Sequence, residues 1–131
     1  MINRHAAVWI DHNEAKIFHV EDGAFDASRI DAPHHHVHRH PKGASEKREH
    51  PADAQHFFHQ VAQALLGAEE ILVVGPATAK LELLKHIHAH EPRLESKIVG
   101  IETVDHPTDG QLAAYVRRYF LPASRTRGTG P

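Results

Sequence analysis

The stretch Ile71-Leu-Val-Val74 is apolar at every position, and it constrains the fold more than any other part of the sequence. A strand of this kind is typical of a parallel sheet that is covered on both faces, because a half-exposed strand alternates apolar and polar residues. The segment before it has the one-sided apolar spacing of a helix that ends at Gly67. The pair therefore predicts an α/β fold, and the apolar face of the helix consists of Phe57, Phe58, Val61, Ala62, Leu65 and Leu66.

Three strands are predicted before this unit, at residues 6–10, 15–20 and 25–32. They are rich in β-branched and aromatic residues, and Asp22-Gly23 is a strong turn signal between the second and the third. Three consecutive strands with short connections favour an antiparallel meander whose third strand lies at an edge.

Two helices and one strand are predicted after the buried strand. Leu81, Leu84 and Ile87 define a helix that ends before a proline, and residues 97–104 form a strand. The last helix begins at the capping box Thr108-x-x-Gln111. The order β-β-β-α-β-α-β-α is that of an RNase H-like mixed five-stranded sheet with helices on its faces.

The 131 residues correspond to one domain, predicted over residues 1–121, followed by a flexible basic tail at 122–131. The sequence has no cysteine, which excludes a disulfide framework, a thiolate metal site and a cysteine nucleophile. Its apolar runs are far shorter than the roughly 20 residues of a membrane helix. We therefore expect a cytoplasmic protein with no membrane partner.

Charge is distributed unevenly along the chain, whose net charge is -2. The segment 34–50 carries +2, residues 117–131 carry +4, and the remainder carries -8. Residues 33–51 form a long basic, histidine-rich loop without apolar periodicity, and loops of that length are usually functional or disordered. Its Lys and Arg side chains could track a phosphate backbone by counterion release. These side chains are Arg39, Lys42, Lys47 and Arg48.

A second hypothesis concerns metal binding, because 15 of the residues are histidines. The tract in the loop could bind Zn or Ni, although no cofactor is required and no HExxH pattern is present. Two further pairs, His56/His59 and His86/His90, have helical spacing, and we expect both to lie on exposed polar faces. The metal-ligand candidates of the tract are His34, His36, His38 and His40.

A third hypothesis is an RNase H-like metal-dependent hydrolase, since such enzymes place carboxylates at the ends of central strands. Asp11 follows the first strand, but the buried strand ends in Gly75-Pro76 without an acid. The stretch Asp105-His106-x-x-Asp109 places a histidine between two acids, as in a general base with an orienting partner. The alternative for this stretch is helix-cap chemistry, with Asp109 complementing the helix dipole.

Four segments of the sequence resemble a known family: Ala7–Phe18, Lys42–Ser45, Glu70–Lys80 and Val104–Leu112. Together they resemble small bacterial translational machinery proteins, which are similar to the central domain of eukaryotic and archaeal class I release factors and of Pelota. The resemblance covers about residues 5–120. It implies an RNase H-like α/β domain that contacts the ribosome, tRNA or rRNA, with no DNA partner.

The resemblance does not extend to the motif that performs termination chemistry. Release factors carry Gly-Gly-Gln in the loop before the first helix, where this chain reads Lys42-Gly-Ala-Ser45. The resemblance therefore implies a non-catalytic, ribosome-associated factor that acts by occupancy, as a stress-response factor would. The predicted RNA-binding residues are Arg39, Lys42, Gly43, Ala44, Ser45, Lys47, Arg48 and Lys80.

Overall fold

The computed structural model describes residues 4–21, 24–33 and 51–129, and its elements follow the predicted order. One element is additional, a single-turn helix that begins at Pro92, where the missing proline N–H needs no partner. The strands are β1 (Arg4–Ile10), β2 (Glu14–Glu21), β3 (Ala24–Asp31), β4 (Glu70–Gly75) and β5 (Ile98–Thr103), and the helices are α2 (Pro51–Leu65), α3 (Ala79–His90), α4 (Pro92–Glu95) and α5 (Asp109–Thr129).

The five strands form one mixed sheet in the order β3-β2-β1-β4-β5. The first three are antiparallel neighbours, whereas β4 is parallel to β1 and β5 is parallel to β4. The predicted fold class is therefore confirmed, as is the position of β3 at an edge. The other edge strand is β5.

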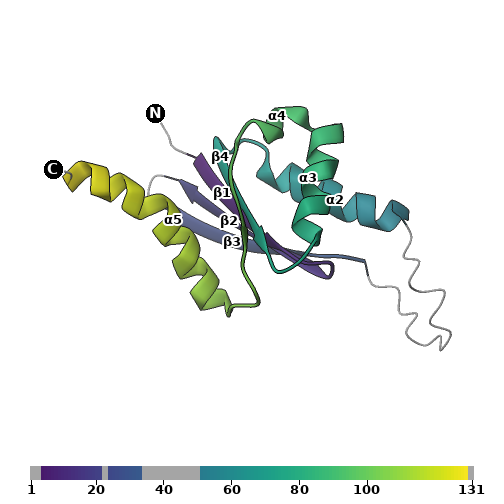
Figure 1. Ribbon diagram of the computed structural model, residues 1–131, viewed down its shortest axis with the longest axis horizontal. Helices are drawn as coiled ribbons and strands as arrows, with labels where there is room; N and C mark the ends of the chain where they lie inside the picture. Colours follow the sequence, from purple (N-terminus) through teal and green to yellow (C-terminus); the bar gives the residue numbers. More distant parts are fainter. Residues whose placement is uncertain (1–3, 22–23, 34–50, 130–131) are drawn as a thin grey trace.

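Helices cover both faces of the sheet, as Figure 1 shows: α2, α3 and α4 lie on one side and α5 on the other. The apolar side chains of β4 contribute to the cores on both faces of the sheet. Ile71 and Val73 belong to the core under α2 and α3, while Leu72 and Val74 belong to the core under α5. This division is why the strand is apolar at every position from Ile71 to Val74.

The end of β4 passes very close to the end of β1. A Cβ atom at Gly75 would overlap the carbonyl oxygen of Ile10, so only glycine lets the two backbones approach in this way. The amide of Val104 then donates to the carbonyl of Gly75 at 3.0 Å, which brings the chain that leaves β5 to the same edge.

The last helix is longer than the sequence predicted. The expected tail began at residue 122, but α5 continues to Thr129, so the backbone of residues 122–129 is helical. The helix continues through Pro122, whose missing N–H leaves one position of the hydrogen-bond ladder without a donor. Neither α5 nor any other helix in the described ranges combines the length and apolar character that a membrane span requires.

Candidate functional site

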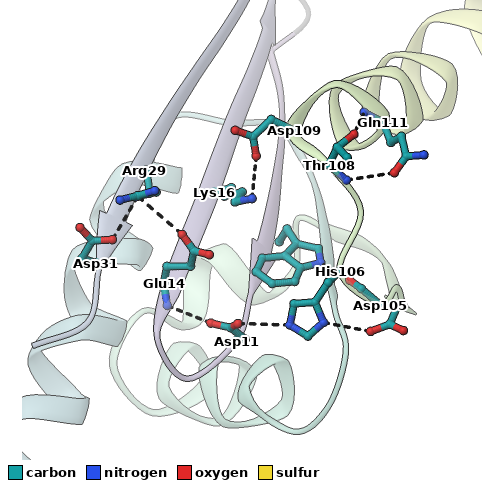
Figure 2. Close-up of polar contacts among 11 residues, drawn as sticks. Asp11, Glu14, Lys16, Arg29, Asp31, Asp105, His106, Thr108, Asp109 and Gln111 are labelled. Atoms are coloured by element: carbon teal, nitrogen blue, oxygen red, sulfur yellow. Dashed lines mark hydrogen bonds and ion pairs between the residues drawn. The ribbon is translucent and has the colours of Figure 1, made fainter. Parts of the chain in front are cut away.

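Polar side chains gather where the parallel strands β1, β4 and β5 end. Because these strands run in the same direction, their carboxyl ends meet at one edge, which is where ligands bind in open α/β sheets. Charged residues from the β1–β2 turn, from β2 and β3, from the β5–α5 connection and from the start of α5 come together there (Figure 2). We call this group the carboxyl edge; it consists of Asp11, Glu14, Lys16, Arg29, Asp31, Asp105, His106 and Asp109.

The imidazole of His106 lies between two carboxylates (Figure 2). Its Nδ1 is 2.9 Å from Oδ1 of Asp105, and its Nε2 is 3.6 Å from Oδ2 of Asp11. The hydrogen bond to Asp105 is the main reason that the pKa of His106 is raised, and the contact with Asp11 adds to it. The sequence singled out the histidine between Asp105 and Asp109; the structure makes Asp11 the second acid instead.

Asp11 also has a structural role that uses its other oxygen. Oδ1 accepts hydrogen bonds from the backbone amides of Asn13 at 2.8 Å and Glu14 at 2.9 Å, which closes the β1–β2 turn. Nearby, the indole Nε1 of Trp9 donates to the carbonyl of Asp105 at 2.9 Å. The array thus joins the β1–β2 turn to the β5–α5 connection, and none of its three members is a serine, threonine or cysteine.

Asp109 forms an ion pair with Lys16 of the sheet rather than with His106. Nζ of Lys16 lies 2.6 Å from Oδ1 of Asp109, and this hydrogen bond lowers the pKa of the carboxyl group. The same ammonium group lies 5.4 Å from the ring centroid of Trp9. This ion pair fixes the start of α5 against β2.

The predicted capping box at the start of α5 is confirmed. The amide of Thr108 donates to Oε1 of Gln111 at 3.0 Å, and the amide of Gln111 donates to Oγ1 of Thr108 at 3.1 Å. Two amides that a helix terminus would leave unpaired are therefore satisfied reciprocally.

The chain leaves β3 at the carboxyl edge. The amide of Ala32 donates to the carbonyl of Asn13 at 2.9 Å, and Arg29 contacts Glu14 at 3.5 Å and Asp31 at 3.1 Å. Residues 34–50 follow directly and lie outside the described residues. The carboxyl edge itself has five carboxylates against the cations of Lys16 and Arg29, so it is acidic and does not attract phosphate.

The geometry does not support the hydrolase hypothesis. Two-metal catalysis requires carboxylates that converge on the same ions, but here an imidazole lies between Asp11 and Asp105, and β4 ends in glycine. Within the described ranges, no group of three or more His, Cys, Asp or Glu side chains is arranged to hold a metal ion.

Lys80, the predicted RNA contact after β4, has little exposure to solvent. Its side chain is 6% exposed, and Nζ donates to the carbonyl of Ala77 at 2.5 Å. A phosphate contact would require the ammonium group to leave this turn. The other predicted RNA residues, from Arg39 to Arg48, and the metal candidates from His34 to His40 lie outside the described residues and stay predictions.

One of the two histidine pairs is placed differently from the prediction. His56 and His59 are exposed as expected, but His86 is 6% exposed, between α2 and α3. Its Nδ1 lies 2.9 Å from Oε1 of Gln55, and its Nε2 is buried with no hydrogen-bond partner among the described residues. The sequence expectation failed because His86 immediately precedes the core residue Ile87 and is covered by the neighbouring helix.

Burial lowers the pKa of His86. The neighbouring imidazoles add to this effect, because a positive charge on any of them disfavours a second one. The ring centroid of His86 lies 4.5 Å from that of His90 and 6.4 Å from that of His59, and the carboxylate of Glu91 opposes the effect. Burial and the neighbouring imidazoles therefore both favour the neutral form of His86 over the charged form.

The fold matches solved proteins of translation. Pelota from Archaeoglobus fulgidus aligns with 88% of this chain at 15% identity and a TM-score of 0.59, and Pelota from Thermoplasma acidophilum aligns with 95% at 18% identity and 0.58. An archaeal translation termination factor aligns with 98% at 12% identity and 0.59. The resemblance predicted from the sequence is confirmed at the level of the fold.

The aligned region is only part of each of these proteins. It covers 31% and 34% of the two Pelota chains and 42% of the termination factor. No family model matches the sequence, and no curated protein matches it. At these identities the similarity establishes a shared domain fold, and activity and partners have to be proposed separately.

Proposed function

We propose that this protein is a translation-associated factor that binds the ribosome or its RNA and acts by occupancy, without catalysing a reaction. The observation that carries the proposal is the similarity of fold, over 88–98% of the chain, to Pelota and to a translation termination factor. The factor would act in the cytoplasm, with the ribosome, tRNA or rRNA as its partner.

The charge distribution supports an RNA contact through the segment 34–50. This segment carries +2 and starts beside an acidic edge of the sheet, so the two parts would respond to phosphate in opposite ways. Arg39, Lys42 and Arg48 would neutralise phosphates, while Gly43 and Ala44 would allow the backbone to come close. Ser45 and Lys47 are the remaining predicted contacts of this segment. The carboxylates of the carboxyl edge would repel the phosphates of the RNA. This repulsion would orient the domain with the carboxyl edge away from the RNA.

The sequence of the segment supports occupancy rather than peptide release. Lys42-Gly-Ala-Ser45 has one glycine and no glutamine where release factors carry Gly-Gly-Gln. The Asp11–His106–Asp105 array contains no serine or cysteine, and its carboxylates hold a turn and a connection together. A peptide-release assay on loaded ribosomes should accordingly show no activity above the background.

The test is co-sedimentation of the purified protein with ribosomes and separated subunits across a range of salt, with a metal chelator present. We expect saturable binding whose salt dependence decreases by about 2 to 3 in log–log slope when Arg39, Lys42 and Arg48 are replaced together by Gln. The chelator ensures that binding does not occur through a metal held by the histidine tract.

A matched control removes the same charge from another part of the molecule. Arg4, Lys85 and Arg93 are exposed and lie outside the segment, and their joint replacement by Gln should leave the slope unchanged. Absence of binding by the unmodified protein at any salt contradicts the proposal. Equal slopes for the two triple variants contradict the role of the segment.

A further inference from the structure

Three imidazoles lie together where α2 packs against α3, and none of them belongs to the carboxyl edge. The ring centroid of His86 is 4.5 Å from that of His90, which follows one turn later on α3, and 6.4 Å from that of His59 on α2. His59 and His90 are exposed, whereas His86 is 6% exposed. The spacing of four residues puts His86 and His90 on one face of α3, and the packing of the two helices adds the third ring.

The two ring nitrogens of His86 have different surroundings. Nδ1 lies 2.9 Å from Oε1 of Gln55, an oxygen that can only accept, so Nδ1 carries the proton of the neutral ring. Nε2 then has a free lone pair, and it is buried without a hydrogen-bond partner among the described residues. Metal-binding histidines have this arrangement, because the ring nitrogen that does not bind the ion donates to an oxygen atom, which fixes the tautomer and orients the ring.

The spacing of the rings is close to that of imidazoles which share one ion. Two imidazoles that bind a tetrahedral Zn²⁺ through nitrogen atoms at about 2.0–2.1 Å have ring centroids about 5 Å apart. The observed separations of 4.5 Å and 6.4 Å lie on either side of this value. Only small movements of the outer two rings, relative to His86, are therefore needed to bring all three nitrogens to a common point.

These movements fall on the two side chains that are free to make them. In the arrangement described, no three such side chains are placed to hold an ion, so His59 and His90 have to turn. Both are exposed, and exposed side chains change rotamer within nanoseconds. Because the ring of His90 packs against that of His86, its rotation also gives an ion access to the buried ring, which Gln55 continues to orient.

We propose that His59, His86 and His90 form a binding site for one divalent transition-metal ion, which links α2 to α3. Imidazole ligands suit Zn²⁺, Ni²⁺ or Cu²⁺, whereas Mg²⁺ and Ca²⁺ prefer oxygen. The carboxylate of Glu91 accepts a hydrogen bond from Nε2 of Gln63 at 3.3 Å and places a negative charge beside the site, which favours a cation there.

The first experiment is urea unfolding of the full chain at about pH 7.5, with a chelator and with about 100 µM Zn²⁺. An ion that binds only the folded protein raises the unfolding midpoint, whereas histidines that bind it equally well in the unfolded chain do not. We expect Zn²⁺ to raise the midpoint. The same shift should remain when the histidines of the tract are replaced together by Asn; these are His34, His36, His38 and His40.

Two variants of α3 separate a ligand from a neighbouring histidine. His90→Asn should weaken Zn²⁺ binding at least about tenfold and remove most of the shift in the midpoint, since one ligand is lost. His88→Asn is the matched control, because His88 is exposed on the same helix and its imidazole pairs with Glu95. It should leave the shift unchanged. Circular dichroism of both variants checks that the fold is retained.

The second experiment identifies the atoms that bind the ion, without changing the buried residue. Zn²⁺ is added to the variant that lacks the histidines of the tract, and the imidazole nitrogens are followed by NMR. The Nε2 resonance of His86 should shift and reach saturation at one ion per chain. The resonances of His56, which is exposed on α2, should not move.

Three results would each overturn the proposal: no rise in the midpoint with Zn²⁺, equal losses of the shift in His88→Asn and His90→Asn, or an Nε2 resonance of His86 that does not respond to Zn²⁺. Weak binding spread over many histidines, without saturation at one ion, would also overturn it and would show an adventitious ion only. Because ribosome binding is measured with a chelator present, this inference and the proposed function can fail separately.

Discussion

Two histidines show, at the scale of single residues, how position determines charge. His86 is buried between helices with its Nε2 unpartnered, whereas His106 is exposed between two carboxylates. Burial lowers the pKa of the first, and the hydrogen bond to Asp105 raises the pKa of the second. The two residues therefore contribute to stability in opposite pH ranges.

For His86 we predict that the stabilising contribution is present above its unfolded pKa of about 6.5 and is lost as the pH falls below that value. The reason is that the folded protein has to accept a proton at a buried site that already faces His59 and His90. Urea unfolding at about pH 8 and about pH 5.5 measures the effect.

The His86→Leu variant should lose less free energy of unfolding than the wild type between these two pH values, since it has no buried group to protonate. His56→Leu is the control, because His56 is exposed on α2. An unchanged pH dependence in His86→Leu would show that other groups cause the acid destabilisation.

For His106 the sign is reversed. Its contribution is present below the unfolded pKa and disappears as the pH rises through the raised folded value. An NMR titration of the imidazole should give a pKa above about 6.5, and Asp105→Asn should move it back toward that value because the main hydrogen bond is lost. Asp31→Asn is the control, because Asp31 lies at the same edge but does not contact His106, and it should leave the pKa of His106 unchanged. Equal shifts in the two variants would argue against the array.

At the scale of elements, the strands and the longer helices were predictable because each carries its own periodicity and its own stop signal. β4 is apolar from Ile71 to Val74, α2 is one-sided, and the start of α5 is specified by Thr108 and Gln111. The sequence missed α4, a single turn too short to show a period, and it ended α5 too early. Local signals therefore identify elements better than they fix their limits.

Two glycines allow a test of how the elements meet. Gly75→Ala should reduce the free energy of unfolding by about 2 kcal/mol or more, because the new methyl group would overlap the carbonyl of Ile10 and push β4 away from β1. Gly110→Ala should instead increase it by about 0.4 to 1 kcal/mol, since nothing lies within 4 Å of the added atom and alanine favours the helix.

Chemical denaturation of the two variants under identical conditions provides the comparison. The substitution is the same in both, so intrinsic propensity cannot produce opposite signs by itself. Similar small effects at both positions would show that β1 and β4 can separate without cost, and would contradict the close approach described here.

At the scale of the whole molecule, the sheet brings together charged groups that no single element contains. The carboxyl edge collects five carboxylates, and the basic segment 34–50 begins next to it.

The order of the elements, the capping box and the regions of opposite charge could all be predicted from the chain alone. Each of these depends on residues close together in the chain, where spacing is a sufficient signal. Only the tertiary structure decided that Asp11 contacts His106, that Asp109 pairs with Lys16, and that His86 is buried. These contacts join segments that are distant in sequence, so they depend on how helices and strands pack and on no local pattern.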